Sequence, residues 1–245
     1  MHYPDPIELQ ETDSTNSYLS AQCDVHEMQN LSCVFSAFQR KGRGQRGNFW
    51  ESEAGSNLLF SFVYYPTYLD ARLQFVLSQA TALSLYDVLS EYTEGISVKW
   101  PNDIYWNDKK ICGTLIENDL TGIHISRSIS GTGVNLNQEK FVSNAPNPVS
   151  LLQITGKRYD RYEILHQIMD RVSAYYGLID KGDYDILARK YRKALYRRDG
   201  FFPYADANGT FRARIVGVEA SGKLLLEDED NCMREYMFKE VSFVI

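Results

Sequence analysis

From residue 96 to residue 135 the sequence reads ISVKWPNDIYWNDKKICGTLIENDLTGIHISRSISGTGVN, and this stretch decides the fold. Three runs rich in apolar and β-branched residues, ISVKW, KKICGTLIEN and IHISRSIS, are separated by turn signals at Pro101, Asn107-Asp108 and Thr121-Gly122. Runs of this kind, bounded by turn residues, are typical of β-strands. The stretch therefore predicts a meander of strands.

The flanking sequence adds strands and helices. Residues 33–38 and 57–65 are rich in aromatic and aliphatic residues and predict two more strands. From residue 200 onward, short β-type runs alternate with turns, as in a small barrel. The sequence thus predicts an α+β domain over 1–195, with helices on a mixed or antiparallel sheet, and an SH3-like β-barrel over 196–245. Apolar periodicity and capping residues predict helices over 17–23, 72–91, 160–180 and 183–195.

The composition excludes several classes of protein. Lys+Arg 26 against Asp+Glu 32 gives a net charge of −6, which disfavours a general nucleic-acid binder. No apolar run approaches the roughly 20 residues of a membrane span, and the polar start lacks a signal-peptide profile. The 4 cysteines form no CxxC pair, and the 4 histidines show no metal-ligand spacing. We therefore expect a cytoplasmic protein with free thiols and no zinc site.

A glycine- and arginine-rich segment, GRGQRG (42–47), lies between two predicted strands and is followed by Trp50. Its glycines let backbone N–H groups turn toward an anion, and its arginines add planar donors suited to phosphate or carboxylate. A flexible basic surface loop has the same composition. An RGG-like nucleic-acid segment is a third interpretation, which the acidic balance of the chain disfavours.

The segment KWPND (99–103) is a second candidate for ligand binding. A strand that ends at Pro101 is expected to leave Asn102 and Asp103 in irregular backbone, where they can contact a ligand. Pro, Asn and Asp are also the residues of an ordinary turn, so the segment alone leaves both interpretations open.

Two lysines follow in the next predicted strand, Lys109 and Lys110. Lysines of a hairpin are usually solvated, but strand alternation turns one of two neighbours inward. An inward lysine near an acidic residue is suited to holding a carboxylate and a phosphate together. Gly113 permits a ligand to approach this strand closely.

Two further motifs are polar and short. GTGVN (131–135) lacks the third glycine and the following helix of a dinucleotide fingerprint, and a bulged strand is the alternative. DSTN (13–16) offers hydroxyl and amide groups, and it also fits the cap of a helix.

Taken together, DSTN, GRG-x-x-G with Trp50, KWPND, KK-x-x-G and GTGVN resemble the biotin–protein ligase family in order and spacing. The tail, with RARIVGV (212–218) and GKLLLEDED (222–230), is similar to that family's C-terminal SH3-like domain. The resemblance implies a class II synthetase-like biotin/lipoate ligase fold over 1–195. It also implies an enzyme that joins biotin to ATP as biotinyl-5′-AMP and transfers it to a lysine of a biotin carboxyl carrier domain.

The resemblance assigns roles residue by residue. It implies that Lys110 and Arg43 neutralise charge as the adenylate forms, and that Asp103 orients or deprotonates the acceptor amine. The positions similar to the family's biotin site are Ser14, Thr15, Asn16, Gln39, Gly42, Arg43, Gly44, Gln45, Trp50, Lys110, Gly113 and Gly131. The positions similar to its ATP site are Arg43, Arg46, Trp50, Asn102, Lys110 and Asn135.

The expected substrates are ATP and biotin, with Mg²⁺ accompanying ATP. Only about a dozen residues precede DSTN, so we expect a monofunctional ligase without a DNA-binding domain, with no DNA or membrane partner, as a monomer or homodimer. Many members carry an arginine where this chain has Gln45, which bears on adenylate retention. The alternatives are a lipoate–protein ligase, whose R-R-x-x-G-G-G block is missing, and a non-catalytic biotin-binding module, which Lys110 and Asp103 argue against.

Overall fold

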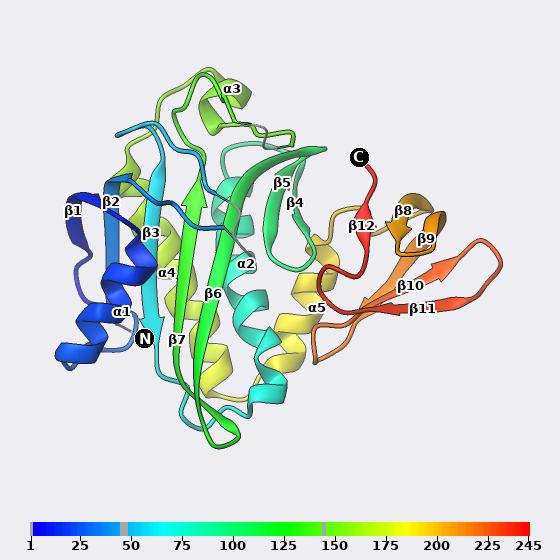
Figure 1. Cartoon of the computed structure of the whole chain (residues 1–245), viewed down its shortest axis with the longest axis horizontal. Coiled ribbons are helices and arrows are strands. Elements are labelled where there is room, and N and C mark those ends of the chain that lie inside the picture. Colours follow the sequence, from blue (N-terminus) through cyan, green and yellow to red (C-terminus); the bar gives the residue numbers. More distant parts are fainter. Residues whose placement is uncertain (1, 45–48, 144–145) are drawn as a thin grey trace.

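The computed structural model describes residues 2–44, 49–143 and 146–245. The chain builds a seven-stranded sheet with the strand order β1-β2-β3-β7-β6-β5-β4, and a separate five-stranded sheet near the C-terminus (Figure 1). None of the helices in the described ranges is long and apolar enough to cross a membrane.

The large sheet is mixed, because β1 pairs with β2 in parallel while every other pairing is antiparallel. This confirms the expected α+β class. Its strands are β1 (Ile7–Thr12), β2 (Cys33–Gln39), β3 (Leu58–Tyr64), β4 (Ile96–Lys99), β5 (Asp103–Trp106), β6 (Lys109–Thr121) and β7 (His124–Val134).

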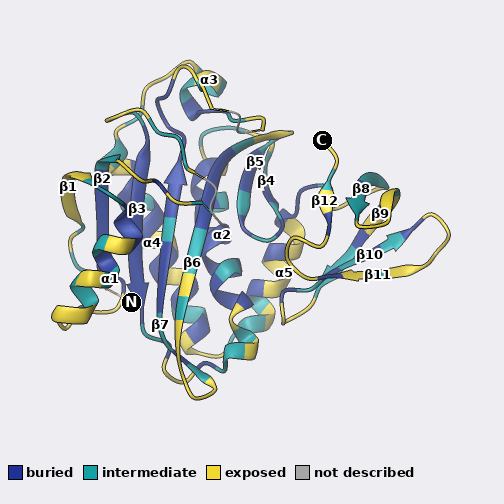
Figure 2. Ribbon diagram, in the orientation of Figure 1, coloured by how far each residue is buried: buried dark blue, intermediate teal, exposed yellow. Residues whose placement is uncertain are grey.

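The two faces of this sheet are covered differently. Helices α2, α4 and α5 pack behind it and enclose the main hydrophobic core, whereas the short α1 crosses the other face (Figures 1 and 2). Under α1, Leu19 packs with Val34, Val63 and Ile129 in a small second cluster. The rest of that face is therefore free to form a site. The helices are α1 (Thr15–Val25), α2 (Phe75–Ser90), α3 (Leu151–Thr155), α4 (Arg161–Asp180) and α5 (Tyr184–Ala194), with a 3-10 turn η2 (Ala71–Leu73) before α2.

The C-terminal sheet, here called the C-terminal module, has the strand order β11-β10-β9-β8-β12 and is antiparallel throughout. It packs against the β4–β5 hairpin, where the Trp100 indole donates to the Gly222 carbonyl at 2.9 Å. The domain boundary at 195/196 and an SH3-like closure stay predictions. The strands are β8 (Phe202–Asp206), β9 (Gly209–Val218), β10 (Leu224–Asp228), β11 (Met233–Tyr236) and β12 (Ser242–Phe243).

Three elements differ from the sequence predictions. Asp103 does not lie in irregular backbone, because it opens β5 and pairs with Lys99, so the turn between β4 and β5 is short. The stretch GTGVN is not bulged, since Gly131 and Gly133 pair in regular register with β6. The first strand, β1, was missed because its side chains are mostly exposed and carry no burial pattern.

A bulge lies instead in β6. Tyr105 of β5 pairs with Lys110, while Ile104 pairs with Cys112, so Ile111 is an extra residue without a counterpart. A bulge of this kind shifts the alternation of side chains by one residue. Lys110 and Gly113 therefore lie on the same face of β6, although three positions separate them.

Candidate functional site

A cavity of about 890 Å³ opens on the face of the large sheet that α1 covers only in part. Segments from both sheets line it, including the start of α1, the glycines of β6 and β7, the β4–β5 hairpin and the end of the C-terminal module. Among the predicted site residues, those that line the cavity are Ser14, Thr15, Asn16, Gln39, Arg43, Gly44, Trp50, Asn102, Asp103, Lys110, Gly113, Gly131 and Asn135.

One end of the cavity is a network of neutral polar groups. Ser14 occupies the N-cap position of α1, but its hydroxyl makes no capping hydrogen bond, so this hydroxyl is available to a ligand in the cavity. Thr15 donates its backbone N–H to Gln39 Oε1 at 2.7 Å. Ser61 Oγ contacts both Thr15 Oγ1 at 2.7 Å and Asn16 Oδ1 at 2.6 Å.

This network has more acceptor capacity than donors. Three oxygen–oxygen contacts join its members, namely Thr15 Oγ1 with Gln39 Oε1 at 3.0 Å and the two contacts of Ser61. Only the hydroxyls of Thr15 and Ser61 carry protons for them, because side-chain amide oxygens are acceptors alone. Two protons cannot fill three contacts. Gln39 Oε1 still accepts the Thr15 backbone N–H, so each acceptor can keep a donor, and the spare lone pairs of these oxygens can accept a ligand N–H group.

Glycines make the floor of the cavity, as their positions on one face of β6 and β7 predict. A Cβ atom added at Gly131 would lie 1.9 Å from Asn16 Oδ1, so only glycine lets α1 come this close. At Gly133 an added Cβ would lie 2.4 Å from the Trp50 indole, and at Gly113 it would lie 2.9 Å from the same ring. The close approach that the glycines permit is thus made by Asn16 and Trp50.

Trp50 lies flat in this floor with an unused donor. Its backbone N–H pairs with the Gly42 carbonyl at 2.9 Å, which anchors one end of the glycine-rich segment beside the floor. The indole Nε1 is buried and has no hydrogen-bond partner in the described part of the chain. Gly42 itself does not line the cavity; an added Cβ there would lie 2.6 Å from the Trp50 carbonyl oxygen.

Lys110 and Asp103 form the charged centre of the cavity. Lys110 Nζ lies 2.7 Å from Asp103 Oδ2, and both side chains are only a quarter exposed. The bulge at Ile111 turns the lysine onto the glycine face, so that a Cβ at Gly113 would lie 3.1 Å from its Nζ. The inward lysine beside an acid is the arrangement that the two-lysine motif predicted, and Lys109 is the exposed neighbour.

Arg43 is held by an acid that sequence reasoning missed. Its NH2 group donates to Glu117 Oε2 at 2.8 Å, and the amide of Asn16 donates to the same oxygen at 2.8 Å. Glu117 thereby connects the arginine of the glycine-rich segment to the neutral network. The predicted site residues Gln45 and Arg46 lie outside the described residues.

Two asparagines bring unused amide groups to the cavity. Asn102 is 4% exposed, and its side chain has no hydrogen-bond partner in the described ranges. Asn135 donates Nδ2 to the Val149 carbonyl at 3.2 Å, whereas its Oδ1 is buried and has no partner in the part of the chain that the structure describes. An unpaired buried amide oxygen such as Asn135 Oδ1 is costly, which is typical of a group that binds a ligand.

The structure adds cavity residues that the motifs did not single out. Lys99 and Tyr105 line the cavity from the β4–β5 hairpin, and Phe238, Lys239 and Phe243 line it from the C-terminal module. The only sequence signal for any of these residues was the KWPND block, which begins with Lys99. Since the module reaches the cavity through tertiary packing, no local pattern pointed to it.

Metal ligation and cysteine chemistry have little support within the described residues. No group of three or more His, Cys, Asp or Glu side chains could hold a metal ion there. All 4 cysteines are free, as predicted, and burial raises the pKa of the Cys33 and Cys112 thiols. A buried thiol with a raised pKa is a packing residue and not a nucleophile.

Comparison with known proteins gives a consistent result. Residues 8–135 match the model of the biotin/lipoate A/B protein ligase family. The biotin–[acetyl-CoA-carboxylase] ligase of Paracoccus denitrificans is 30% identical over 235 residues, covering 89% of this chain and 92% of that protein. The bifunctional ligase/repressor BirA of Escherichia coli is 27% identical, covering 94% of this chain and 71% of that protein.

The fold agrees with the sequence matches. A crystallised biotin protein ligase from Aquifex aeolicus in complex with biotin and ATP superposes with a TM-score of 0.80. The two chains are 28% identical, and the superposition covers 98% of each.

Proposed function

The chain belongs to the biotin/lipoate A/B protein ligase family, and we propose that it activates biotin with ATP and transfers it to a protein lysine. The acceptor in this proposal is a lysine of a biotin carboxyl carrier domain. The observation that carries the choice of biotin is the neutral network around Ser61, whose oxygens have more acceptor capacity than the network has donors to fill. The ureido ring of biotin has N–H groups that can donate to these oxygens, whereas the dithiolane ring of lipoate has none.

In the first step a carboxylate oxygen of biotin attacks the α-phosphorus of ATP, the bond to the β-phosphate oxygen breaks, and pyrophosphate leaves with that electron pair. The attacking carboxylate and the α-phosphate are both anions, so cations must bring them together. Lys110 is the half-buried cation at the centre of the cavity, and Arg43 lies at its edge on Glu117. We assign charge neutralisation to both, with Mg²⁺ entering as part of the nucleotide substrate.

In the second step the acceptor amine attacks the biotinyl carbonyl carbon, the bond to AMP breaks, and the amine loses a proton. Asp103 is the carboxylate nearest to Lys110, and we assign it the orientation of the amine and acceptance of that proton. Gly113 and Gly131 let Trp50 and Asn16 lie close to the sheet, so that Trp50 forms part of the floor under the ligand, and Asn102 and Asn135 donate to or accept from the nucleotide.

The test is ATP–pyrophosphate exchange measured side by side with biotin and with lipoate. Exchange that depends on biotin, and that falls at least a hundredfold in Lys110→Met, is the expected result. Lys109→Met is the matched control, because Lys109 is the exposed neighbour of Lys110 on the same strand. Exchange driven by lipoate and not by biotin would reverse the choice of substrate. Biotin binding without any AMP-linked product would indicate a non-catalytic module.

A further inference from the structure

One wall of the cavity is made by residues 135–143, a segment without helix or strand that follows β7. In the antiparallel pair of β3 and β7, Leu58 at the start of β3 lies opposite Val134 at the end of β7. The segment that enters β3, residues 51–57, therefore meets the wall segment at the same end of the sheet (Figure 1). The backbone groups of both segments lack the ladder of a sheet and need other hydrogen-bond partners.

Two buried amides join the inner parts of the two segments. Asn57 is 0% exposed and Gln138 is 1% exposed, and Asn57 Nδ2 donates to Gln138 Oε1 at 2.6 Å. Asn57 Oδ1 accepts the backbone N–H of Leu136 at 3.0 Å. Gln138 Oε1 in turn accepts the backbone N–H of Glu53 at 3.1 Å. Each amide thus bonds to the opposite segment, which fixes the wall as far as residue 138.

Glu51 joins the outer part of the wall. Its Oε1 accepts the backbone N–H of Val142 at 2.8 Å and Nε2 of Gln138 at 3.2 Å, and its Oε2 accepts the backbone N–H of Ser143 at 2.9 Å. Burial raises the pKa of Glu51, but the hydrogen bonds from Ser143 and Val142 outweigh burial and leave the pKa below its ordinary value. The carboxylate is therefore ionised at neutral pH, where it holds these N–H groups.

The contacts of this carboxylate suit the holding of backbone better than they suit chemistry. Glu51, Phe141 and Ser143 all line the cavity, where the proposed substrates are anions. A bare carboxylate there would repel them, and it would be a candidate base or metal ligand. Both oxygens of Glu51 instead accept N–H groups, so its charge is compensated within the wall. Proton transfer or metal binding would require breaking these bonds.

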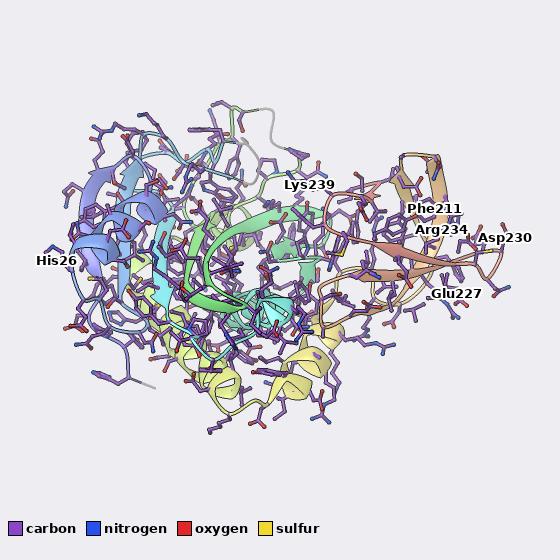
Figure 3. All side chains as sticks on the ribbon, turned by 60° about the horizontal axis from the view of Figure 1, so that its bottom comes forward. His26, Phe211, Glu227, Asp230, Arg234 and Lys239 are labelled. Carbon is purple, nitrogen blue, oxygen red and sulfur yellow. The ribbon has the colours of Figure 1, made fainter. Side chains whose placement is uncertain are left out.

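Another wall, in the C-terminal module, is fixed in a different way. Lys239 lines the cavity from the turn between β11 and β12, and Figure 3 shows it on the side of the module nearest to the large sheet, with Arg234 and Asp230 farther out. This turn is anchored by strands of a sheet, whereas Val142 lies outside any regular element and is 88% exposed. Since packing contributes so little at Val142, the position of residues 139–143 depends on their hydrogen bonds.

We propose that Glu51 is a positioning residue, which ties residues 139–143 to the segment after Trp50 and fixes this wall before any ligand binds. The kinetic consequence rests on the proposed ligase function, because the wall begins at Asn135, to which we assigned a contact with the nucleotide. A wall that is already ordered takes nothing from the binding energy of ATP. Without Glu51 the ordering of the wall weakens ATP binding, while the chemical step is unaffected.

Amide hydrogen exchange in the ligand-free protein measures the tether directly and needs no substrate. In Glu51→Ala we expect the N–H groups of Val142 and Ser143 to exchange about tenfold faster or more. The strand residues of β7 keep their wild-type rates, which distinguishes a local release from a loss of global stability. Glu53→Ala is the matched control, because Glu53 is an exposed neighbour whose carboxylate contacts Ser56 of its own segment at 3.2 Å.

Steady-state ATP–pyrophosphate exchange measures the consequence for the reaction. We expect the KM for ATP to rise about tenfold or more in Glu51→Ala, with kcat within about threefold of the wild type, because only uniform binding is lost. A residue that merely stabilised the fold would act differently. Its loss would reduce the amount of active enzyme, and thus the apparent kcat, and would leave KM unchanged.

Wild-type hydrogen exchange at Val142 and Ser143 in Glu51→Ala would overturn the proposal, and so would equal changes in Glu53→Ala or an unchanged KM for ATP. Glu51→Gln is the second variant should Glu51→Ala fail to fold. Its amide keeps one acceptor oxygen and loses the other, so we expect one of the two N–H groups to exchange faster, and protection of both would overturn the proposal. Failure of the ligase function shows differently, as a wild type without biotin-dependent pyrophosphate exchange whose hydrogen exchange still responds to Glu51→Ala.

Discussion

The contact between Gly131 and Asn16 allows one quantitative prediction. In Gly131→Ala the new Cβ would lie 1.9 Å from Asn16 Oδ1, whereas ordinary contacts begin at 3.4 Å. Asn16 must therefore retreat by the difference, 3.4 − 1.9 = 1.5 Å, or β7 must shift by as much. A movement of this size breaks the 2.6 Å contact with Ser61 and the 2.8 Å bond to Glu117.

The magnitude follows from those two hydrogen bonds. A hydrogen bond contributes about 0.5–1.5 kcal/mol net, so losing two of them from the network that we propose binds biotin costs about 1–3 kcal/mol. That corresponds to a loss of roughly 5- to 150-fold in biotin affinity. Overpacking also lowers the free energy of unfolding by about 1–3 kcal/mol. For a chain of this length, each kcal/mol lowers Tm by about 2–4 °C.

Isothermal titration with biotin and thermal unfolding measure the two effects. Gly217→Ala is the matched control, because Gly217 also lies in a strand and an added Cβ there meets nothing within 4 Å. An alanine at such a position restricts the unfolded chain and leaves Tm equal or higher. A Gly131→Ala protein with the Tm and the biotin Kd of the wild type would refute the reasoning about this contact.

Three further predictions concern other parts of the site. Asp103→Asn should leave biotin-dependent pyrophosphate exchange within about threefold of wild type but slow transfer from preformed adenylate at least tenfold, because an amide accepts no proton. Equal losses in single-turnover assays of both steps would contradict the role proposed for Asp103. At pH 8 an alkylating reagent should label the exposed Cys232 and spare Cys33 and Cys112, whose thiols have pKa values raised by burial, as mass spectrometry can show; labelling of all three at one rate would contradict their burial. Biotin with ATP should change the tryptophan fluorescence, and Trp50→Phe should remove most of that change, although Trp100 also lines the cavity and remains; a change of the wild-type size would place the ligand away from Trp50.

The sequence predicted the elements whose side chains repeat with a clear period. Helices expected over 160–180 and 183–195 are observed as Arg161–Asp180 and Tyr184–Ala194, because both bury one apolar stripe. The strand Ile7–Thr12 has no such stripe and depends on pairing with β2, which no local pattern reports.

The site was predicted where a motif is compact and missed where it depends on tertiary contacts. Lys110 and Asp103, seven positions apart, meet as the two-lysine argument expected. Glu117 was missed because its partners, Arg43 and Asn16, come from distant parts of the chain. The contact of the Lys99 ammonium with the Phe243 ring joins the two sheets, and no spacing around Lys99 contains that information.

The extra residue at Ile111 has a consequence for anyone who edits or transplants this site. At the buried positions 111 and 112, we expect a substitution to be tolerated far better than a deletion. Deleting one residue would restore strict alternation and turn the Lys110 ammonium into the apolar layer beneath the sheet. A graft onto another sheet must therefore carry the tetrapeptide from Lys110 to Gly113 as one unit. Conversely, when a lysine and a glycine three positions apart in a strand face the same cavity, the strand must contain a β-bulge between them.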